Sequence, residues 1–194
     1  MPKPVILVSG KDPVREAGVG HTTYVRAHAR AALRAGYEPH LLVVSPQAEV
    51  VESEFGTIHR VRSPWPYGRQ PLGVGYRQWL LWLHGPLLAC YGARLARDLD
   101  TRSVVHAFGP YGGVGDAIAR GSGGRATAIL SAYSTFRHEA AGKIAGFAAI
   151  PERRARYRLR AELAITSLGT VRTERRGFER AARILVNYES VRRL

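Results

Sequence analysis

The sequence of 194 residues is poor in cysteine, in acidic side chains and in long apolar runs. Its one cysteine, Cys90, excludes an internal disulfide, so we expect a protein of a reducing, intracellular compartment. Cys90 stands in the apolar run "LLACYG", where we expect a small buried side chain and no nucleophile. The longest apolar run, "WLLWLHGPLLACYG", is shorter than the about 20 residues that cross a bilayer, and "MPKPVILVSG" is typical of a first strand rather than a signal peptide.

The scarcity of acids gives the chain a strongly basic character. There are 15 Asp and Glu against 29 Lys and Arg, a formal net charge of +14, and all but three of the basic residues are Arg. Such a surface attracts polyanions, namely nucleic acid, anionic lipid headgroups or phosphorylated ligands. The preference for Arg over Lys can reflect the base composition of a genome as well as the binding of a polyanion. The charge alone therefore selects no partner.

Short apolar runs alternate with longer helical segments, and 45% of the residues are hydrophobic. We expect strands at 4–9, 39–45, 57–62, 103–108, 126–133 and 183–188. We expect helices at 22–36, from about 74 to 98 with a disturbance at Gly85 and Pro86, within 109–120, and over most of 152–182. The alternation of the third strand, 57–62, indicates a half-exposed strand near an edge of the sheet.

Continuous apolar strands indicate burial on both faces. The expected fold is therefore α/β: one Rossmann-like, doubly wound domain over 1–194, with a mostly parallel sheet and helices on both faces. In such sheets ligands bind at the carboxyl ends of the strands, near the switch in strand order. This selects the segments after the first, fourth, fifth and sixth expected strands.

The stretch "EAGVGHTTYV" places Gly18 and Gly20 just before a helix. A dinucleotide fingerprint needs G-x-G-x-x-G directly after the first strand, whereas these glycines follow it by about ten residues. A P-loop needs G-K-[ST], and "GHT" lacks the lysine. The chain has no G-x-S-x-G elbow of a hydrolase, and its Cys and His spacing gives no zinc site. A flexible loop over 10–20 remains, which either holds a phosphate at the helix N-terminus or is an ordinary glycine-rich turn.

The order of these pieces resembles the N-terminal domain of GT-B glycosyltransferases, most closely the retaining enzymes of family 4. The resemblance rests on "EAGVGHTTYVRAHARAALRAGYEPHLLVVSP", on "SVVHAFGPYGG" and on "AARILVNYESVRRL", and spans nearly the whole chain. It implies that this chain is the acceptor half of a hexosyltransferase whose donor is a nucleotide sugar, with no cofactor and no metal. It also implies that the C-terminal donor domain is absent beyond Leu194, so the isolated domain is expected to be inactive.

The resemblance also implies the roles of individual residues. His106 and His138 are the candidate catalytic residues. The glycine loop that would reach the donor phosphates consists of Gly18, Val19, Gly20 and His21. The candidate acceptor-binding residues are Tyr111, Gly112, Tyr133, Ser134 and Arg137. The chain departs from the family in the fourth-strand motif, which often carries two histidines. His106 matches the first, but Phe108 stands at the second position, so that role would be unfilled or taken by His138 or Tyr133.

Each of these residues also has a purely structural interpretation. His106 is equally well explained as a hydrogen-bonded core histidine, and the glycines after the fourth strand as a tight strand-to-helix turn. The segment 151–183 holds ten Arg and four Glu beside an apolar stripe of Tyr157, Ala161, Ala164, Leu168 and Val171. It could lie on an anionic membrane, but we expect the stripe to pack on the sheet.

The transferase hypothesis thus predicts a cytoplasmic protein, with peripheral contact at the inner face of the membrane as a further option. Its partners would be a nucleotide sugar and an acceptor that is a glycan, a lipid-linked sugar or a small molecule. One alternative is a stand-alone basic module that binds nucleic acid or anionic lipid. Nucleic acid is not expected, because interleaved aromatics and known motifs are missing. Another alternative, a different nucleotide-linked Rossmann enzyme, is weakened by the failed fingerprints.

Overall fold

The structure is a computed structural model that describes residues 2–15, 20–64, 76–132 and 135–186. Its sheet has seven strands in the order β3-β4-β2-β1-β5-β6-β7, and β3 alone is antiparallel to its neighbour. The strands are β1 (Lys3–Gly10), β2 (Tyr37–Ser45), β3 (Glu49–Ser53), β4 (Gly56–Arg62), β5 (Ser103–Phe108), β6 (Ala126–Ala132) and β7 (Arg183–Val186). All six strands expected from the sequence are present in this sheet, which confirms the Rossmann-like α/β fold.

The helices are α1 (Gly20–Arg34), α2 (Tyr76–Asp98), α3 (Gly112–Gly121), α4 (Phe136–Ala145), α5 (Arg153–Ile165) and α6 (Val171–Arg180). The short turns are η1 (Gly109–Tyr111), η2 (Gly146–Ala149) and the π-turn η3 (Thr166–Thr170). Gly36 follows α1 with a φ of +77° and ends that helix, because this left-handed conformation favours glycine.

Two apolar cores lie on opposite faces of the sheet. Val25 and Ala29 of α1 pack with Leu7 and Val43 on one face. On the other face Leu88 of α2 and Ile118 of α3 join the second core, which is made of Ile6, Val8, Leu42, Val44, Val61, Val105, Ala107 and Leu130. Alternate residues of β1 thus enter different cores, which is why this strand is buried along nearly its whole length.

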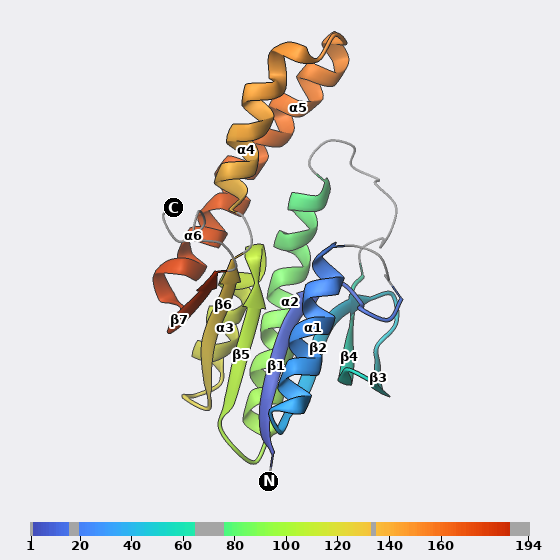
Figure 1. Cartoon of the computed structure of the whole chain (residues 1–194), viewed down its shortest axis with the longest axis vertical. Helices are drawn as coiled ribbons and strands as arrows, with labels where there is room; N and C mark the ends of the chain where they lie inside the picture. Colours follow the sequence, from blue (N-terminus) through green and yellow to red (C-terminus); the bar gives the residue numbers. More distant parts are fainter. Residues whose placement is uncertain (1, 16–19, 65–75, 133–134, 187–194) are drawn as a thin grey trace.

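The third expected strand, 57–62, differs from the sequence-based prediction in its burial. In β4 the residues from Ile58 to Val61 are buried. The reason is a strand that the sequence analysis missed: β3 pairs antiparallel with β4 and forms the edge of the sheet. The prediction of a half-exposed third strand was therefore wrong, and Figure 1 shows β3 outside β4.

The C-terminal helical segment also departs from its prediction. The helices α4 and α5 lead away from the sheet, beyond the carboxyl ends of its strands (Figure 1). Tyr157 is 77% exposed and Leu168 is 62% exposed, so the predicted apolar stripe does not cover the sheet. The π-turn η3 lies between Tyr157 and Val171 and shifts the helical phase there. Residues spaced by one α-helical period across this turn therefore do not lie on one face.

Two further predictions about α2 need correction. Cys90 is exposed and not buried. The helix α2 runs from Tyr76 to Asp98 through Pro86 without a break. Within the described residues, no helix combines the length and the apolar character needed to cross a bilayer.

Candidate functional site at the carboxyl ends of β1 and β5

The order of the six parallel strands defines a switch point between β1 and β5. Counted along the chain without β3, the order across the sheet is third, second, first, fourth, fifth, sixth. The helix after β1 packs on one face, and the helix after β5 packs on the other. Their connections diverge at the carboxyl ends of β1 and β5, which is where ligands bind in sheets of this topology.

Gly10 and Tyr111 meet at this point. Gly10 ends β1 with a φ of +68°, and a Cβ atom on it would overlap the hydroxyl group of Tyr111. Tyr111 ends the turn η1, directly after β5. The Tyr111 side chain therefore crosses from the end of β5 to the end of β1. Position 10 requires glycine for two reasons: its positive φ, and its close contact with the Tyr111 hydroxyl.

His21, in the first turn of α1, lies at the same place. Its Nε2 is 3.0 Å from the carbonyl oxygen of Ser9 and 3.3 Å from the Ser9 hydroxyl. Its ring centroid is 6.4 Å from that of Tyr111 and 6.0 Å from that of Phe108. Two residues selected from the sequence, His21 and Tyr111, are thus brought together at the switch point.

His106 lies beneath this surface, buried under α1. Its Nε2 is 2.7 Å from the hydroxyl of Ser131 on β6, and its ring stacks on Phe108 at 4.5 Å between centroids. His28 of α1 contacts it edge-on at 4.8 Å. Burial, reinforced by the charge of His28, lowers the pKa of His106 to about 3, so its imidazole is neutral at physiological pH. This favours a hydrogen-bonding and positioning role over proton transfer.

The first part of the loop after β1 is held in place, although the sequence predicts a flexible loop. The buried Asp12 carboxylate accepts a hydrogen bond of 2.7 Å from Nε of the buried Arg60, and others from the backbone N–H groups of Val14 and Arg15. Burial by itself raises the pKa of Asp12, but these hydrogen bonds outweigh it and lower that pKa. Arg26 of α1 donates from Nε to the carbonyl oxygen of Pro13 at 2.7 Å.

Other predicted residues lie elsewhere or outside the described residues. Gly18, Val19, Tyr133 and Ser134 fall outside them. Gly20 is the first residue of α1, with open space around its missing side chain. Gly112 is buried against Gly177 of α6 and Leu130 of β6, so its missing side chain faces a helix–helix contact.

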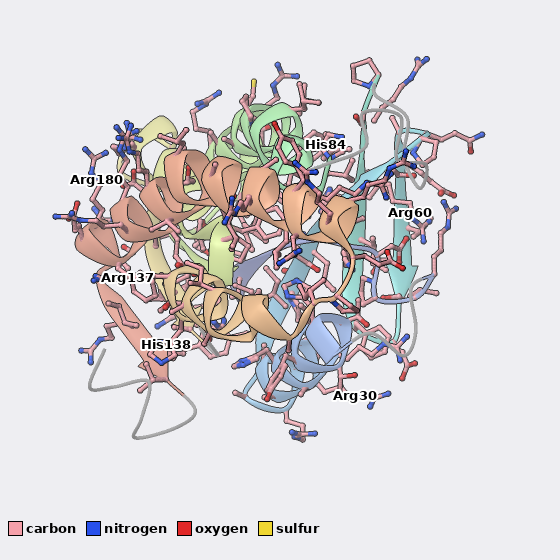
Figure 2. All side chains as sticks on the ribbon, turned by 90° about the horizontal axis from the view of Figure 1, so that it is seen from above. Arg30, Arg60, His84, Arg137, His138 and Arg180 are labelled. Atoms are coloured by element: carbon pink, nitrogen blue, oxygen red, sulfur yellow. The ribbon has the colours of Figure 1, made fainter. Side chains whose placement is uncertain are left out.

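Arg137 and His138 are exposed in the first turn of α4. In the view from above, both lie on the side of the molecule opposite Arg60 of β4 (Figure 2). Within the described residues, no hydrogen bond or ring contact joins the exposed His138 to the buried His106.

Sequence reasoning missed three polar residues of the site: Ser9, His28 and Ser131. The spacing of His21 and His28, seven residues apart on one helix, places both on one face and was a usable signal. Ser9 and Ser131 each stand near the carboxyl end of a buried strand, where a small polar residue is less expected than an apolar one. Their partners come from other elements, and for this reason no local pattern shows them.

The arrangement offers imidazoles, hydroxyl groups and the N-terminus of α1, whose first turn contains no acid. Such groups can donate hydrogen bonds to hydroxyl or phosphate oxygens. In the part of the chain that the structure describes, no three His, Cys, Asp or Glu side chains are grouped so that they could hold a metal ion.

A scan of the chain against models of protein families found no match, and a search of curated proteins found no match either. The geometry at β1 and β5 is therefore the basis on which a function is proposed.

Proposed function

We propose that this chain is the acceptor-binding half of a glycosyltransferase that takes its sugar from a nucleotide-sugar donor. The observation that carries the proposal is the convergence of His21, Tyr111 and Gly10 at the switch point between β1 and β5. The order of motifs along the sequence supports the same assignment.

The electrostatics of this edge suit a phosphate-bearing donor. The N-terminus of α1 carries partial positive charge, and the first turn of the helix has no acid to oppose it. Asp12, the acid in the described part of the preceding loop, is paired with Arg60. The departing nucleoside diphosphate would be stabilised by backbone N–H groups at Gly20 and His21.

The polar side chains at the strand ends would serve the acceptor. The Tyr111 hydroxyl and the His21 imidazole can bind sugar hydroxyl groups. His106 would act through Ser131 and Phe108, because it is buried and neutral. We assign it as a positioning residue that fixes the strand ends, and we assign no proton transfer to it.

A nuclear magnetic resonance titration of the chain, labelled with nitrogen-15 in its histidines, tests the site. Nucleoside diphosphates are expected to shift the imidazole signals of His21 and His28. The signals of His40 and His59 should stay fixed, because these side chains lie on the α2 side, where His59 contacts Tyr91. Equal shifts of all four signals, or none, would contradict the proposal.

A paired substitution sharpens the titration. A Cβ atom at Gly20 would meet no other atom within 4 Å, and Gly20→Phe should weaken the shifts by blocking the start of α1. Gly142→Phe, in α4 and equally open, is the control and should leave them unchanged. Equal effects of the two substitutions would remove the start of α1 from the site.

A further inference from the structure

The helical hairpin formed by α4, η2 and α5 carries charge and apolar surface that the proposed transferase site does not use. We propose that this hairpin is a binding site for an anionic lipid bilayer, with the apolar tip entering the lipid and the arginines of α5 binding headgroup phosphates. The inference is independent of the sugar-transfer chemistry.

The charge of the hairpin is the first argument. Residues 136–168 contain seven Lys and Arg against three Glu. Five of the arginines lie within three turns of α5: Arg153, Arg154, Arg156, Arg158 and Arg160. Throughout the described part of the chain, no ion pair joins Arg153, Arg154, Arg156 or Arg158 to an acid. Their charge is thus available to an external anion.

The tip of the hairpin is the second argument. The stretch "IAGFAAIP" from Ile144 to Pro151 has no charged or hydrogen-bonding side chain and lies between Lys143 and Glu152, after which the arginines begin. Ile144 is 60% exposed. Figure 1 shows this tip as the part of the molecule farthest from the sheet. An apolar tip with an excess of cations close to it matches a bilayer, whose hydrocarbon lies next to its phosphates.

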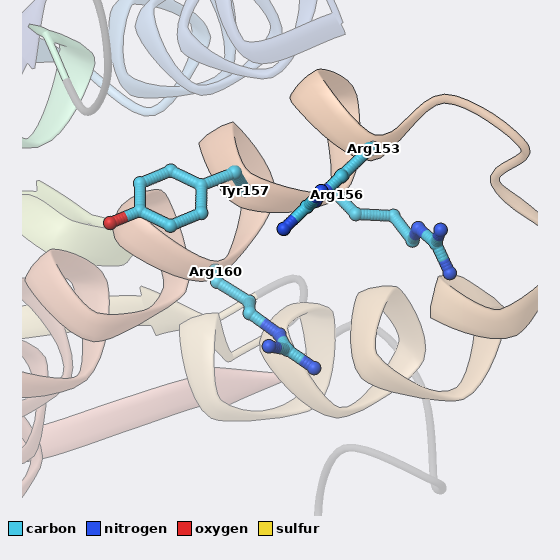
Figure 3. A pocket seen from close by; sticks show the side chains of 4 residues that line it. All are labelled: Arg153, Arg156, Tyr157 and Arg160. Atoms are coloured by element: carbon cyan, nitrogen blue, oxygen red, sulfur yellow. The ribbon is translucent and has the colours of Figure 1, made fainter.

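A hollow on α5 supplies the third argument. Arg153, Arg156, Tyr157 and Arg160 line a space of about 350 Å³, and Figure 3 shows their side chains along one side of the helix. The guanidinium groups of Arg153 and Arg156 can together bind one phosphate with several charge-assisted hydrogen bonds. The largely exposed Tyr157 ring is of the kind that settles at the boundary between headgroups and lipid chains.

A bilayer accounts for these observations better than a nucleic acid does. Nucleic acid would use the arginines but would leave the uncharged tip without a role, whereas a lipid surface uses both. The hairpin also leads away from the body of the domain, so a flat surface can reach its tip.

Vesicle flotation tests the proposal with the chain as it exists. The chain should bind vesicles of phosphatidylcholine mixed with phosphatidylglycerol and should not bind phosphatidylcholine alone, and added salt should weaken binding. Replacing Arg153, Arg154, Arg156 and Arg158 by Gln should weaken binding about six-hundredfold, since each of the four arginines near an anionic surface contributes about fivefold.

A matched variant removes the same charge from the body of the protein. It carries Gln in place of Arg34, Arg62, Arg102 and Arg183, which are all exposed and outside the hairpin. This variant should bind vesicles nearly as well as the unaltered chain. Equal losses in the two variants would overturn the proposal, because net charge and not the hairpin would then explain binding.

A polarity-sensitive dye reports on the tip itself. The dye is attached through Ile144→Cys in a chain that also carries Cys90→Ser. Its fluorescence emission should shift to the blue when anionic vesicles are added. Binding without a shift would overturn insertion of the tip. Binding to duplex DNA but not to vesicles, lost in the hairpin variant, would overturn the lipid assignment in favour of nucleic acid.

Discussion

The Nε2 atom of His106 lies 2.7 Å from the hydroxyl oxygen of Ser131, and both side chains are buried. This contact joins β5 to β6 next to the proposed site. A polar pair in the core stays stable only while both partners keep their hydrogen bond, because a buried polar atom without a partner loses its solvation energy. The protonation of His106 therefore matters for the fold.

Acid should destabilise the protein well before its carboxylates titrate. Burial and the charge of His28 lower the pKa of His106 to about 3, and burial and the charge of His40 lower that of His59 to about 4. The unfolded chain binds protons on these groups first as the pH falls below the ordinary histidine value. Stability is therefore complete above about pH 6.5 and is lost progressively toward the folded-state values.

Between about pH 7.5 and about pH 5.5 each of these two histidines should cost about 1 kcal/mol of unfolding free energy. Denaturant unfolding at the two pH values measures the loss, and His106→Gln should reduce the pH dependence. A variant with the pH dependence of the unaltered chain would show that His106 does not carry the effect.

Gly10→Ala should destabilise the fold by about 2–4 kcal/mol, from its φ of +68° and from overlap with the Tyr111 hydroxyl. In a Tyr111→Ala background the overlap disappears, so the same change should cost only about 1–2 kcal/mol. Thermal or denaturant unfolding of the unaltered chain, the two single variants and the double variant gives the cost of Gly10→Ala in both backgrounds. Identical costs in the two backgrounds would mean that Tyr111 does not lie over Gly10.

The close contact between α3 and α6 should also be sensitive to an added methyl group. A Cβ on Gly177 would lie 2.7 Å from the carbonyl carbon of Gly112, so Gly177→Ala forces the helices apart and should cost about 1–3 kcal/mol. Gly142→Ala has open space in α4 and should be neutral or stabilising by up to about 1 kcal/mol. Equal changes in unfolding free energy for Gly177→Ala and Gly142→Ala would contradict the close approach of α3 and α6.

The buried ion pair between Asp12 and Arg60 should matter far more than the exposed pair between Arg15 and Glu49. Arg60 also pairs with the half-exposed Glu49 at 2.7 Å. Asp12→Ala leaves the buried Arg60 with this partner alone and should cost about 3 kcal/mol. Arg15→Gln should cost at most about 1 kcal/mol. The unfolding free energies of the two variants measure this difference. Similar values would contradict the claim that the Asp12–Arg60 pair anchors the loop after β1.

The parallel sheet could be predicted from the sequence because most of its strands are short apolar runs and β4 alternates apolar and polar residues. β3 could not, since "EVVES" is mostly polar and gains its place only by pairing with β4. The helix α4 was missed because it has no apolar face. The direction of α4 and α5 depends on tertiary contacts, and the π-turn at Thr166–Thr170 breaks the periodicity on which the predicted stripe rested.

The candidate site was predictable only in part. His21, Tyr111 and His106 follow from their positions at strand ends and at a helix start. Ser131 contributes only through its contact with His106, across two strands and 25 residues of sequence. His138 looked equally suitable in the sequence, but it is exposed in the first turn of α4, without a described contact to His106.

Transfer of a labelled sugar tests the central claim most directly. The protein encoded by the whole gene would be incubated with labelled nucleotide sugars and an extract of the cells that carry the gene. The account predicts incorporation of label that falls at least about tenfold in Gly20→Phe and is unchanged in Gly142→Phe. A protein that consumes no nucleotide sugar, or a Gly20→Phe variant with full activity, would contradict it.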